Sequence, residues 1–176
     1  MLNIIKYFED RTGISIPLVF CSNANAKALD HVREYNIDAY ILNKEDLYNS
    51  DKIINELQDK DIDLIILAGF MWMIPDNLIT AFPDQMINIH PALLPQYGGK
   101  GMYGKKVHEA VIENKESETG MTIHYVNENY DEGKIIFQAK LPILDSDTPE
   151  SIAAKVKELE FEHYPKVIED LLLNLN

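Results

Sequence analysis

Short apolar runs and segments of helical periodicity alternate along the first half of the chain. The runs are typical of buried strands and lie at residues 16–20, 39–42, 63–70 and 86–89. The segments between them repeat apolar residues every three or four positions and lie at residues 22–36, 50–60 and 75–81. Strands that alternate with helices in this way pair in parallel, because each helix returns the chain to the same edge of the sheet. The pattern therefore predicts an α/β fold with a mostly parallel sheet.

The second half of the chain has a different pattern. Apolar spacing predicts a helix at 105–114 and strands at 119–126 and 134–139. A long C-terminal helix is expected at 149–173, because Thr148 offers an N-cap and Pro149 suits the first helical position. No repeat, low-complexity tract or linker interrupts the sequence, which predicts a single domain over residues 1–176.

The composition narrows the classes of protein to which the chain can belong. With 46% hydrophobic and 26% charged residues, it is typical of a folded globular protein. The net charge of −13 argues against nucleic acid binding, which needs a basic face. No apolar run approaches the roughly 20 residues that cross a bilayer, and the N-terminus lacks the features of a signal peptide. Together with the single cysteine, Cys21, this predicts a cytoplasmic protein that binds neither membranes nor nucleic acid.

One strand end carries candidate chemistry. In the stretch INIHPALLPQYGGKGMYG, Asn88 and His90 end a predicted strand, and prolines and glycines then shape an irregular loop. Parallel sheets bind their ligands at the carboxyl ends of strands. The Asn amide and the His imidazole are N–H donors, and two converging donors stabilise the oxyanion of an acyl transfer. Asp131, close to Gly133, is a candidate third member, although each residue alone is also typical of a turn or cap.

Three segments together carry a resemblance to a known family. LIILAGFMW, NIHPALLP and TGMTIHYVNENYDEGKIIFQ resemble the phosphoribosylglycinamide formyltransferase family of folate-dependent formyltransferases. The resemblance runs in order from about Asn3 to the helix at 150–168. It implies the Rossmann-like, doubly wound formyltransferase fold. It also implies transfer of the formyl group of 10-formyltetrahydrofolate to the amine of glycinamide ribonucleotide in purine synthesis, without a covalent enzyme intermediate.

The resemblance also implies site residues, position by position. Asn88, His90 and Asp131 match the catalytic residues, with Asp131 raising the proton affinity of His90. The residues that match the glycinamide ribonucleotide site are Gly69, Phe70, Met71, Pro91 and Glu160, the last at the ribose hydroxyls. The residues that match the folate site are Trp72, Met73, Ile74, Asn88, Glu128, Asn129, Tyr130 and Asp131. Trp72 replaces an Arg that is frequent in the family, a small change where the contact is largely through the main chain.

Other polar residues near the site have two interpretations each. His124 lies on an alternating strand, where it either lines the site or is satisfied in the core. Neither a His-x-x-x-His helix nor a cysteine pair supports a metal site, so no metal cofactor is expected. Lys100, Lys105 and Lys106 either attract the folate tail or the substrate phosphate, or form a solvated helix start.

The resemblance further implies that the chain starts inside the family fold. Family members begin with a strand and a Gly-rich turn whose amides hold the substrate phosphate at a helix N-terminus. Here the segment LNIIKYFED resembles the end of that helix, so the opening strand and the phosphate loop are expected to be absent. Two alternatives remain, a 10-formyltetrahydrofolate hydrolase and a folate-binding remnant without catalysis. A monomer or a homodimer is expected.

Overall fold

The computed structural model describes residues 1–26 and 28–175, which divide into two compact units. Unit 1 comprises Met1–Asp63 and Ile74–Ala81. Unit 2 comprises Leu64–Met73 and the chain from Phe82 onward. Each unit is described by itself below.

Unit 1 pairs two short parallel strands with helices. Its elements are α1 (Leu2–Phe8), β1 (Leu18–Cys21), α2 (Ala28–Glu34), β2 (Asp38–Ile41), α3 (Lys44–Tyr48), α4 (Lys52–Asp59) and α5 (Asp76–Ala81). β1 and β2 pair in parallel, with Leu18 opposite Asp38 and Cys21 opposite Ile41. The parallel pairing predicted from the alternating pattern is therefore confirmed for this unit.

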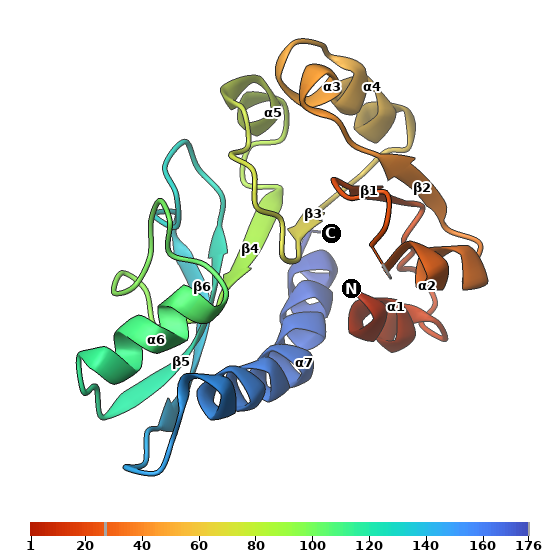
Figure 1. Ribbon diagram of the computed structural model, residues 1–176. Helices are drawn as coiled ribbons and strands as arrows, with labels where there is room; N and C mark the ends of the chain where they lie inside the picture. The colour runs from red at the N-terminus through yellow and green to blue at the C-terminus, as the bar shows by residue number, and fades with distance from the viewer. Residues whose placement is uncertain (27, 176) are drawn as a thin grey trace. The chain divides into compact units, whose positions relative to one another are not determined.

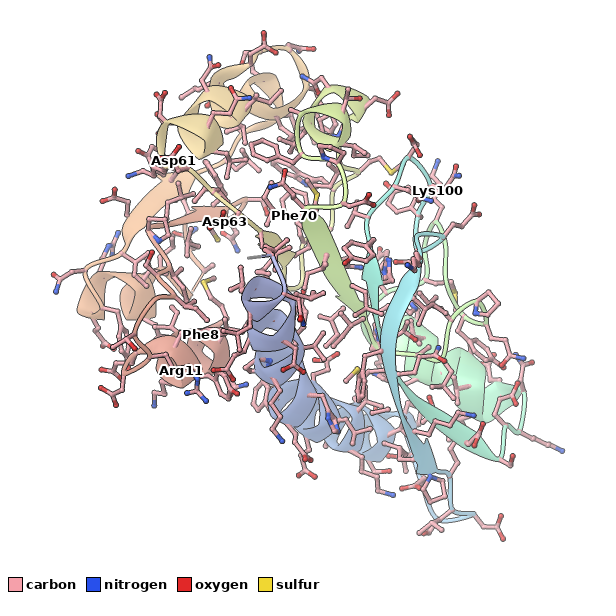
Figure 2. All side chains as sticks on the ribbon, turned by 180° about the vertical axis from the view of Figure 1, so that it is seen from behind. Phe8, Arg11, Asp61, Asp63, Phe70 and Lys100 are labelled. Carbon is pink, nitrogen blue, oxygen red and sulfur yellow. The ribbon has the colours of Figure 1, made fainter. Side chains whose placement is uncertain are left out.

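Two helices of unit 1 show how local sequence sets local structure. The helix expected in LNIIKYFED is present as α1, with Phe8 buried and Arg11 just beyond its end (Figure 2). The Arg11 guanidinium lies 3.6 Å from the centroid of the Tyr7 ring, a cation–π contact. Helix α3 was not predicted, although Asn43 caps it by accepting a hydrogen bond from the Asp46 N–H at 2.7 Å.

Unit 2 has a mixed sheet covered by a long helix. Its elements are β3 (Ile65–Leu67), β4 (Met86–His90), α6 (Lys105–Glu113), β5 (Glu118–Tyr125), β6 (Ile135–Pro142) and α7 (Pro149–Leu173). The strands pair in the order β3-β4-β5-β6, parallel between β3 and β4 and antiparallel from β4 to β6 (Figure 1). Helix α7 packs on β5, β6 and α6. The α/β fold and the long C-terminal helix are confirmed.

Strand β3 is shorter than the sequence suggested. Residues 63–70 were expected to be extended, whereas the strand spans Ile65–Leu67 and its residues are half-buried. At the C-terminal end the cause is local, because Gly69 has a φ of +71° and so leaves the extended conformation just after the strand. The bend places Phe70 beyond the carboxyl end of β3 (Figure 2).

Helix α7 begins and ends where the sequence predicted. Thr148 accepts a hydrogen bond from the Ser151 N–H at 3.2 Å, and the Ser151 hydroxyl accepts one from the Thr148 N–H at 2.9 Å. This reciprocal capping box satisfies main-chain donors that the first turn leaves open. None of the helices within the described part of the chain combines the length and the apolar character that a bilayer crossing requires.

The connection between β5 and β6 depends on a glycine. A Cβ atom on Gly133 would lie 1.7 Å from the carbonyl oxygen of Tyr125, so only glycine fits there. The close approach lets the Tyr125 N–H donate to the Lys134 carbonyl at 2.9 Å. The loop that carries Asp131 is thereby folded back towards the end of β4.

Candidate active site

Asn88 and His90 lie together on one face of β4. Alternate residues of a strand share a face, and both side chains project near its carboxyl end. His90 is 4% exposed, and Asn88 is half-buried. The antiparallel register with β5 places His124 opposite Asn88, with the Asn88 Nδ2 atom 3.2 Å from His124 Nε2.

The carboxylate of Asp131 lies between two histidines. Its Oδ2 atom is 3.4 Å from His90 Nδ1, and its Oδ1 atom is 3.5 Å from His124 Nε2. The Gly99 N–H donates to Oδ2 at 3.0 Å. Asp131 has a φ of +58°, a left-handed conformation that non-glycine residues adopt at a cost. The contacts of its side chain hold this conformation in place.

The opposite nitrogen of His90 faces a main-chain carbonyl. His90 Nε2 lies 2.7 Å from the Tyr97 carbonyl oxygen. A carbonyl only accepts hydrogen bonds, so Nε2 must carry a proton. The Nδ1 atom, which faces Asp131, then carries one only when the ring is cationic. The site therefore fixes the tautomer of neutral His90.

Burial and charge act in opposite directions on these groups. Burial lowers the pKa of His90, and this outweighs the charge of Asp131 and the Tyr97 carbonyl, both of which raise it. The expected direction of the Asp131 effect is thus present, but the net pKa of His90 is below its ordinary value. Burial raises the pKa of the Asp131 carboxyl, but hydrogen bonding to His124, the proximity of His90 and the Gly99 N–H together lower it below its usual value.

A cavity of about 340 Å³ opens beside Asp131. Residues of two loops and the start of β6 line it: Leu94, Pro95, Gly98, Gly99, Tyr130, Asp131, Glu132, Gly133 and Ile135. Tyr130 and Asp131 are thus the expected folate-site residues that line this cavity. Glu128 and Asn129 lie exposed on the same loop. The cavity is large enough for part of a ligand of drug-like size.

The residues of the segment after β3, from Gly69 to Ile74, are not among those that line this cavity. Gly69 and Met71 are exposed, and the rings of Phe70 and Trp72 meet edge to face with centroids 6.0 Å apart. Met73 is half-buried in unit 2, whereas Ile74 is buried in unit 1.

Two further expected substrate residues occupy separate elements of unit 2. Pro91 follows His90 directly. Glu160 is half-buried on α7, where burial raises its pKa against the opposing charge of Lys157. One turn further along, the Tyr164 hydroxyl donates to the Leu67 carbonyl at 2.9 Å. This bond holds the Glu160 region of α7 at the carboxyl end of β3.

The three lysines differ in their surroundings. Lys100 is exposed on the loop after β4 (Figure 2). Lys105 pairs with Glu109 at 3.2 Å and with Glu150 at 3.0 Å. These contacts favour the helix-start interpretation for Lys105, because its charge is already paired. Lys106 lies 5.0 Å from the centroid of the Tyr103 ring.

Several site groups could not be found from the sequence. The Tyr97 carbonyl and the Gly99 N–H are main-chain groups, which have no signature in residue type. Thr122 is fully buried and holds the loop in place, accepting from the Leu94 N–H at 3.0 Å and donating to the Ala92 carbonyl at 2.6 Å. The alternation of apolar and polar residues over 119–126 was the one feature of the sequence that pointed to Thr122. The same alternation left two interpretations for His124, and the structure places it in the site.

Residues 1–26 and 28–175 contain no group of three or more His, Cys, Asp or Glu side chains arranged to hold a metal ion. The expectation that the protein uses no metal cofactor stays a prediction. The chemistry available in the site comes from an amide, two imidazoles and a carboxylate.

Comparison with known proteins identifies the class to which this site belongs. The formyl transferase family profile matches residues 3–168. The chain belongs to the formyl transferase family.

Its relatives carry a more particular name. The chain is 33% identical over 173 residues to the phosphoribosylglycinamide formyltransferase of Bacillus subtilis (strain 168), covering 96% of this chain and 86% of that protein. It is 44% identical over 117 residues to the chloroplastic phosphoribosylglycinamide formyltransferase of Arabidopsis thaliana, covering 66% of this chain. The match spans 40% of the length of that plant relative. The crystal structure of phosphoribosylglycinamide formyltransferase from Bacillus halodurans superposes with a TM-score of 0.86 at 29% identity, covering 99% of this chain and 90% of that one.

Proposed function

We propose that this chain transfers the formyl group of 10-formyltetrahydrofolate to the amine of glycinamide ribonucleotide, in purine biosynthesis. The names of its relatives support this reaction. The observation that carries it is the Asp131 carboxylate between His90 and His124, beside the Asn88 amide. An amide N–H donor next to a half-buried carboxylate and two imidazoles suits an acyl transfer that passes through an oxyanion.

Asn88 is proposed to bind the developing oxyanion. An Asn side chain has two N–H donors, and the 3.2 Å approach of Nδ2 to His124 Nε2 engages one of them. The second remains to meet the formyl oxygen. The substrate amine attacks the formyl carbon, the C–N bond forms, and the carbonyl electron pair moves to the oxygen. Collapse of this intermediate breaks the bond to N10 of the folate, which receives the proton that the amine loses.

His90 is proposed to gain a second proton as the reaction proceeds, so that Nδ1 donates to Asp131 while Nε2 donates to the Tyr97 carbonyl. Burial lowers the pKa of His90 in the free site, which disfavours the cation before substrate binds. A negative charge that develops nearby favours the protonated ring, and Asp131 acts in the same direction. Differential stabilisation of this kind lowers the barrier, because it is strongest in the transition state. Asp131 also accepts from the Gly99 N–H, which fixes its position.

The remaining site roles follow the family resemblance. We propose that the folate contacts Trp72, Met73, Ile74, Asn88, Glu128, Asn129, Tyr130 and Asp131. We propose that glycinamide ribonucleotide contacts Gly69, Phe70, Met71, Pro91 and Glu160. The cavity lined by Tyr130 and Asp131 supports the folate assignment.

The proposal extends to the organisation and location of the protein. A single family match over residues 3–168 spans both compact units and supports one formyltransferase domain. The cytoplasmic location rests on the single cysteine and the absence of a membrane-length apolar run in the sequence. A monomer or a homodimer stays a prediction.

One assay tests the reaction directly. The protein is incubated with folate that carries an isotope in the formyl group, with and without glycinamide ribonucleotide. Transfer of label to the nucleotide supports the proposal, whereas release as formate without nucleotide indicates a hydrolase. Folate binding without either product indicates a non-catalytic protein. A His31→Ala variant is the matched control for His90→Ala, because His31 lies in unit 1 and pairs with Glu34 at 3.6 Å.

A further inference from the structure

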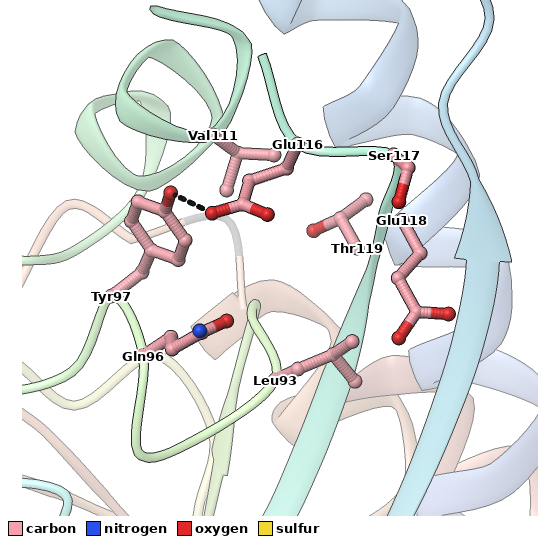
Figure 3. Close-up of a pocket in the computed structure, with 8 residues that line it drawn as sticks. All are labelled: Leu93, Gln96, Tyr97, Val111, Glu116, Ser117, Glu118 and Thr119. Carbon is pink, nitrogen blue, oxygen red and sulfur yellow. Dashed lines mark hydrogen bonds between the residues drawn. The ribbon is translucent and has the colours of Figure 1, made fainter. Parts of the chain in front are cut away.

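A second cavity of about 250 Å³ is lined in part by the loop that follows His90 (Figure 3). It is lined by Leu93, Gln96, Tyr97, Val111, Glu116, Ser117, Glu118 and Thr119. None of these residues has a role in the formyl transfer proposed above, except that the Tyr97 carbonyl faces His90. The cavity is therefore a separate feature of unit 2.

Thr119 presents an unsatisfied hydroxyl to this cavity. The residue is 2% exposed, and among the described residues its Oγ1 atom has no hydrogen-bond partner. Figure 3 shows this oxygen directed into the cavity, on the side of Glu116 and Tyr97. Buried polar atoms are nearly always paired, so an unpaired one calls for a ligand or an ordered water.

The carboxylate of Glu116 is held in a defined position. The Tyr97 hydroxyl donates to Glu116 Oε1 at 2.7 Å (Figure 3). The Asn114 side-chain amide donates to the Tyr97 hydroxyl at 3.0 Å. This chain of bonds orients the carboxylate before any ligand arrives, which reduces the entropy that binding would otherwise cost.

The lining favours a positively charged ligand. Within the described part of the chain, the residues that line the cavity include two glutamates and neither lysine nor arginine. Glu118 is paired with Lys140 at 2.7 Å, which leaves Glu116 as the carboxylate that faces Thr119. Leu93 and Val111 supply apolar surface. The volume lies below the roughly 300–1,000 Å³ of sites for drug-sized ligands, so the ligand is small.

We propose that this cavity binds a small primary alkylammonium ion. Its N–H groups donate to Glu116 and to the unpaired Thr119 hydroxyl, and its carbon atoms pack on Leu93 and Val111. A charge-assisted hydrogen bond to the carboxylate supplies most of the affinity. The hydroxyl and the apolar wall select for a short, unbranched amine.

Methyl NMR titration with propylammonium chloride tests this proposal. Signals of Leu93, Val111 and Thr119 should shift saturably, with a dissociation constant in the millimolar range. The probes 1-propanol and propanoate have a similar carbon chain but no positive charge, and they should bind at least about tenfold more weakly, as loss of a charged hydrogen bond predicts. Absence of saturation, or equal binding of 1-propanol, would overturn the proposal. Equal binding of 1-propanol would indicate that the positive charge of the ligand contributes nothing to binding.

Two variants locate the contacts. Glu116→Gln keeps an acceptor for Tyr97 but removes the charge, and it should weaken propylammonium binding about tenfold. Glu113→Gln makes the same charge change at an exposed residue outside the cavity lining and should leave binding within about twofold. Equal effects of the two variants would show that only the general negative charge matters, which contradicts a built site.

The Thr119→Val variant should show two effects together, higher stability and weaker binding, which would not be expected if Thr119 had a purely structural role. The substitution removes an unpaired buried hydroxyl without changing shape, so it should raise the melting temperature by about 2–4 °C. The same change should weaken propylammonium binding several-fold. A lower melting temperature would show that the hydroxyl is already satisfied, and unchanged binding would show that it does not contact the ligand. Either result contradicts the proposal.

Discussion

Replacing Thr122 by Val removes one hydroxyl group and changes the side-chain volume very little. The hydroxyl is fully buried and contacts two main-chain groups of the loop after β4, the Leu94 N–H at 3.0 Å and the Ala92 carbonyl at 2.6 Å. It also accepts from Gln138 Nε2 at 2.9 Å, but that amide has a second acceptor in the Leu94 carbonyl at 3.0 Å. The substitution therefore strands two buried main-chain groups.

The expected loss of stability follows from these two groups. Each unpaired buried group costs about 1–3 kcal/mol, so Thr122→Val should lower the free energy of unfolding by about 2–6 kcal/mol. That is a large share of the roughly 5–15 kcal/mol that typically holds a domain together. For a chain of this size, each kcal/mol corresponds to about 2–4 °C, so the melting temperature should fall by roughly 5–20 °C.

Calorimetry and urea unfolding measure this loss, with Thr122→Ser as the matched control. Ser keeps the hydroxyl and removes one methyl group, for which a cost of only about 1 kcal/mol is expected. Formyl transfer by Thr122→Val should also fall, because the loop carries the Tyr97 carbonyl that contacts His90. If Thr122→Val is as stable as the natural protein, or if Thr122→Ser is equally destabilised, the hydroxyl does not hold the loop.

Three further predictions concern the site and the start of α7. Asn88→Ala and His90→Ala should each lower turnover about 10²–10³-fold, with folate affinity nearly unchanged in His90→Ala. Steady-state kinetics and folate titration measure both quantities, and full turnover in either variant would show that these roles are misassigned. Asp131→Asn should lower the NMR titration midpoint of His90, because the charge of Asp131 raises that pKa and its removal leaves burial unopposed; an unmoved midpoint would contradict the contact. The pKa of Asp147 is lowered to about 2, mainly by the hydrogen bond from Lys155. The ionised Asp147 therefore stabilises the folded state above the pKa that this carboxyl has in the unfolded chain, and the stabilisation is lost as the pH falls towards 2. Lys155→Met should therefore reduce the difference in unfolding free energy between about pH 5 and pH 2. Urea unfolding at both pH values measures this difference, and an equal difference in the variant and the natural protein would refute the prediction.

The sequence predicted correctly the elements whose ends are set by residues at those ends, such as a helix cap. Helix α7 was placed correctly at both ends, and its start is set locally by the capping box of Thr148 and Ser151, with Pro149 in the first turn. Strand β3 was placed too long, because apolar periodicity gives no warning of the left-handed φ at Gly69. Helix α3 was missed, although the cap at Asn43 was available to be read.

The candidate site was predictable to the extent that side chains build it. Asn88, His90 and Asp131 were named from strand ends and the family resemblance, and the structure brings them together with His124. The contact of Asp131 with His124 depends on the antiparallel register of β5 and on the turn at Gly133, which are tertiary properties. The lowered pKa of His90 also follows from burial, which residue order does not report. The roles of these residues stay predictions until they are tested.

The bond between the Gly99 N–H and the Asp131 carboxylate makes one amide proton an internal indicator of the site. Hydrogen exchange at Gly99 is slow only while this bond persists, and an ionised carboxylate accepts more strongly than a protonated one. As the pH falls through the titration of Asp131, exchange at Gly99 should accelerate relative to its intrinsic rate. Ligands that alter the ionisation of the carboxylate should shift that transition. The charge state of Asp131 can therefore be followed without substrate turnover and without changing a single residue.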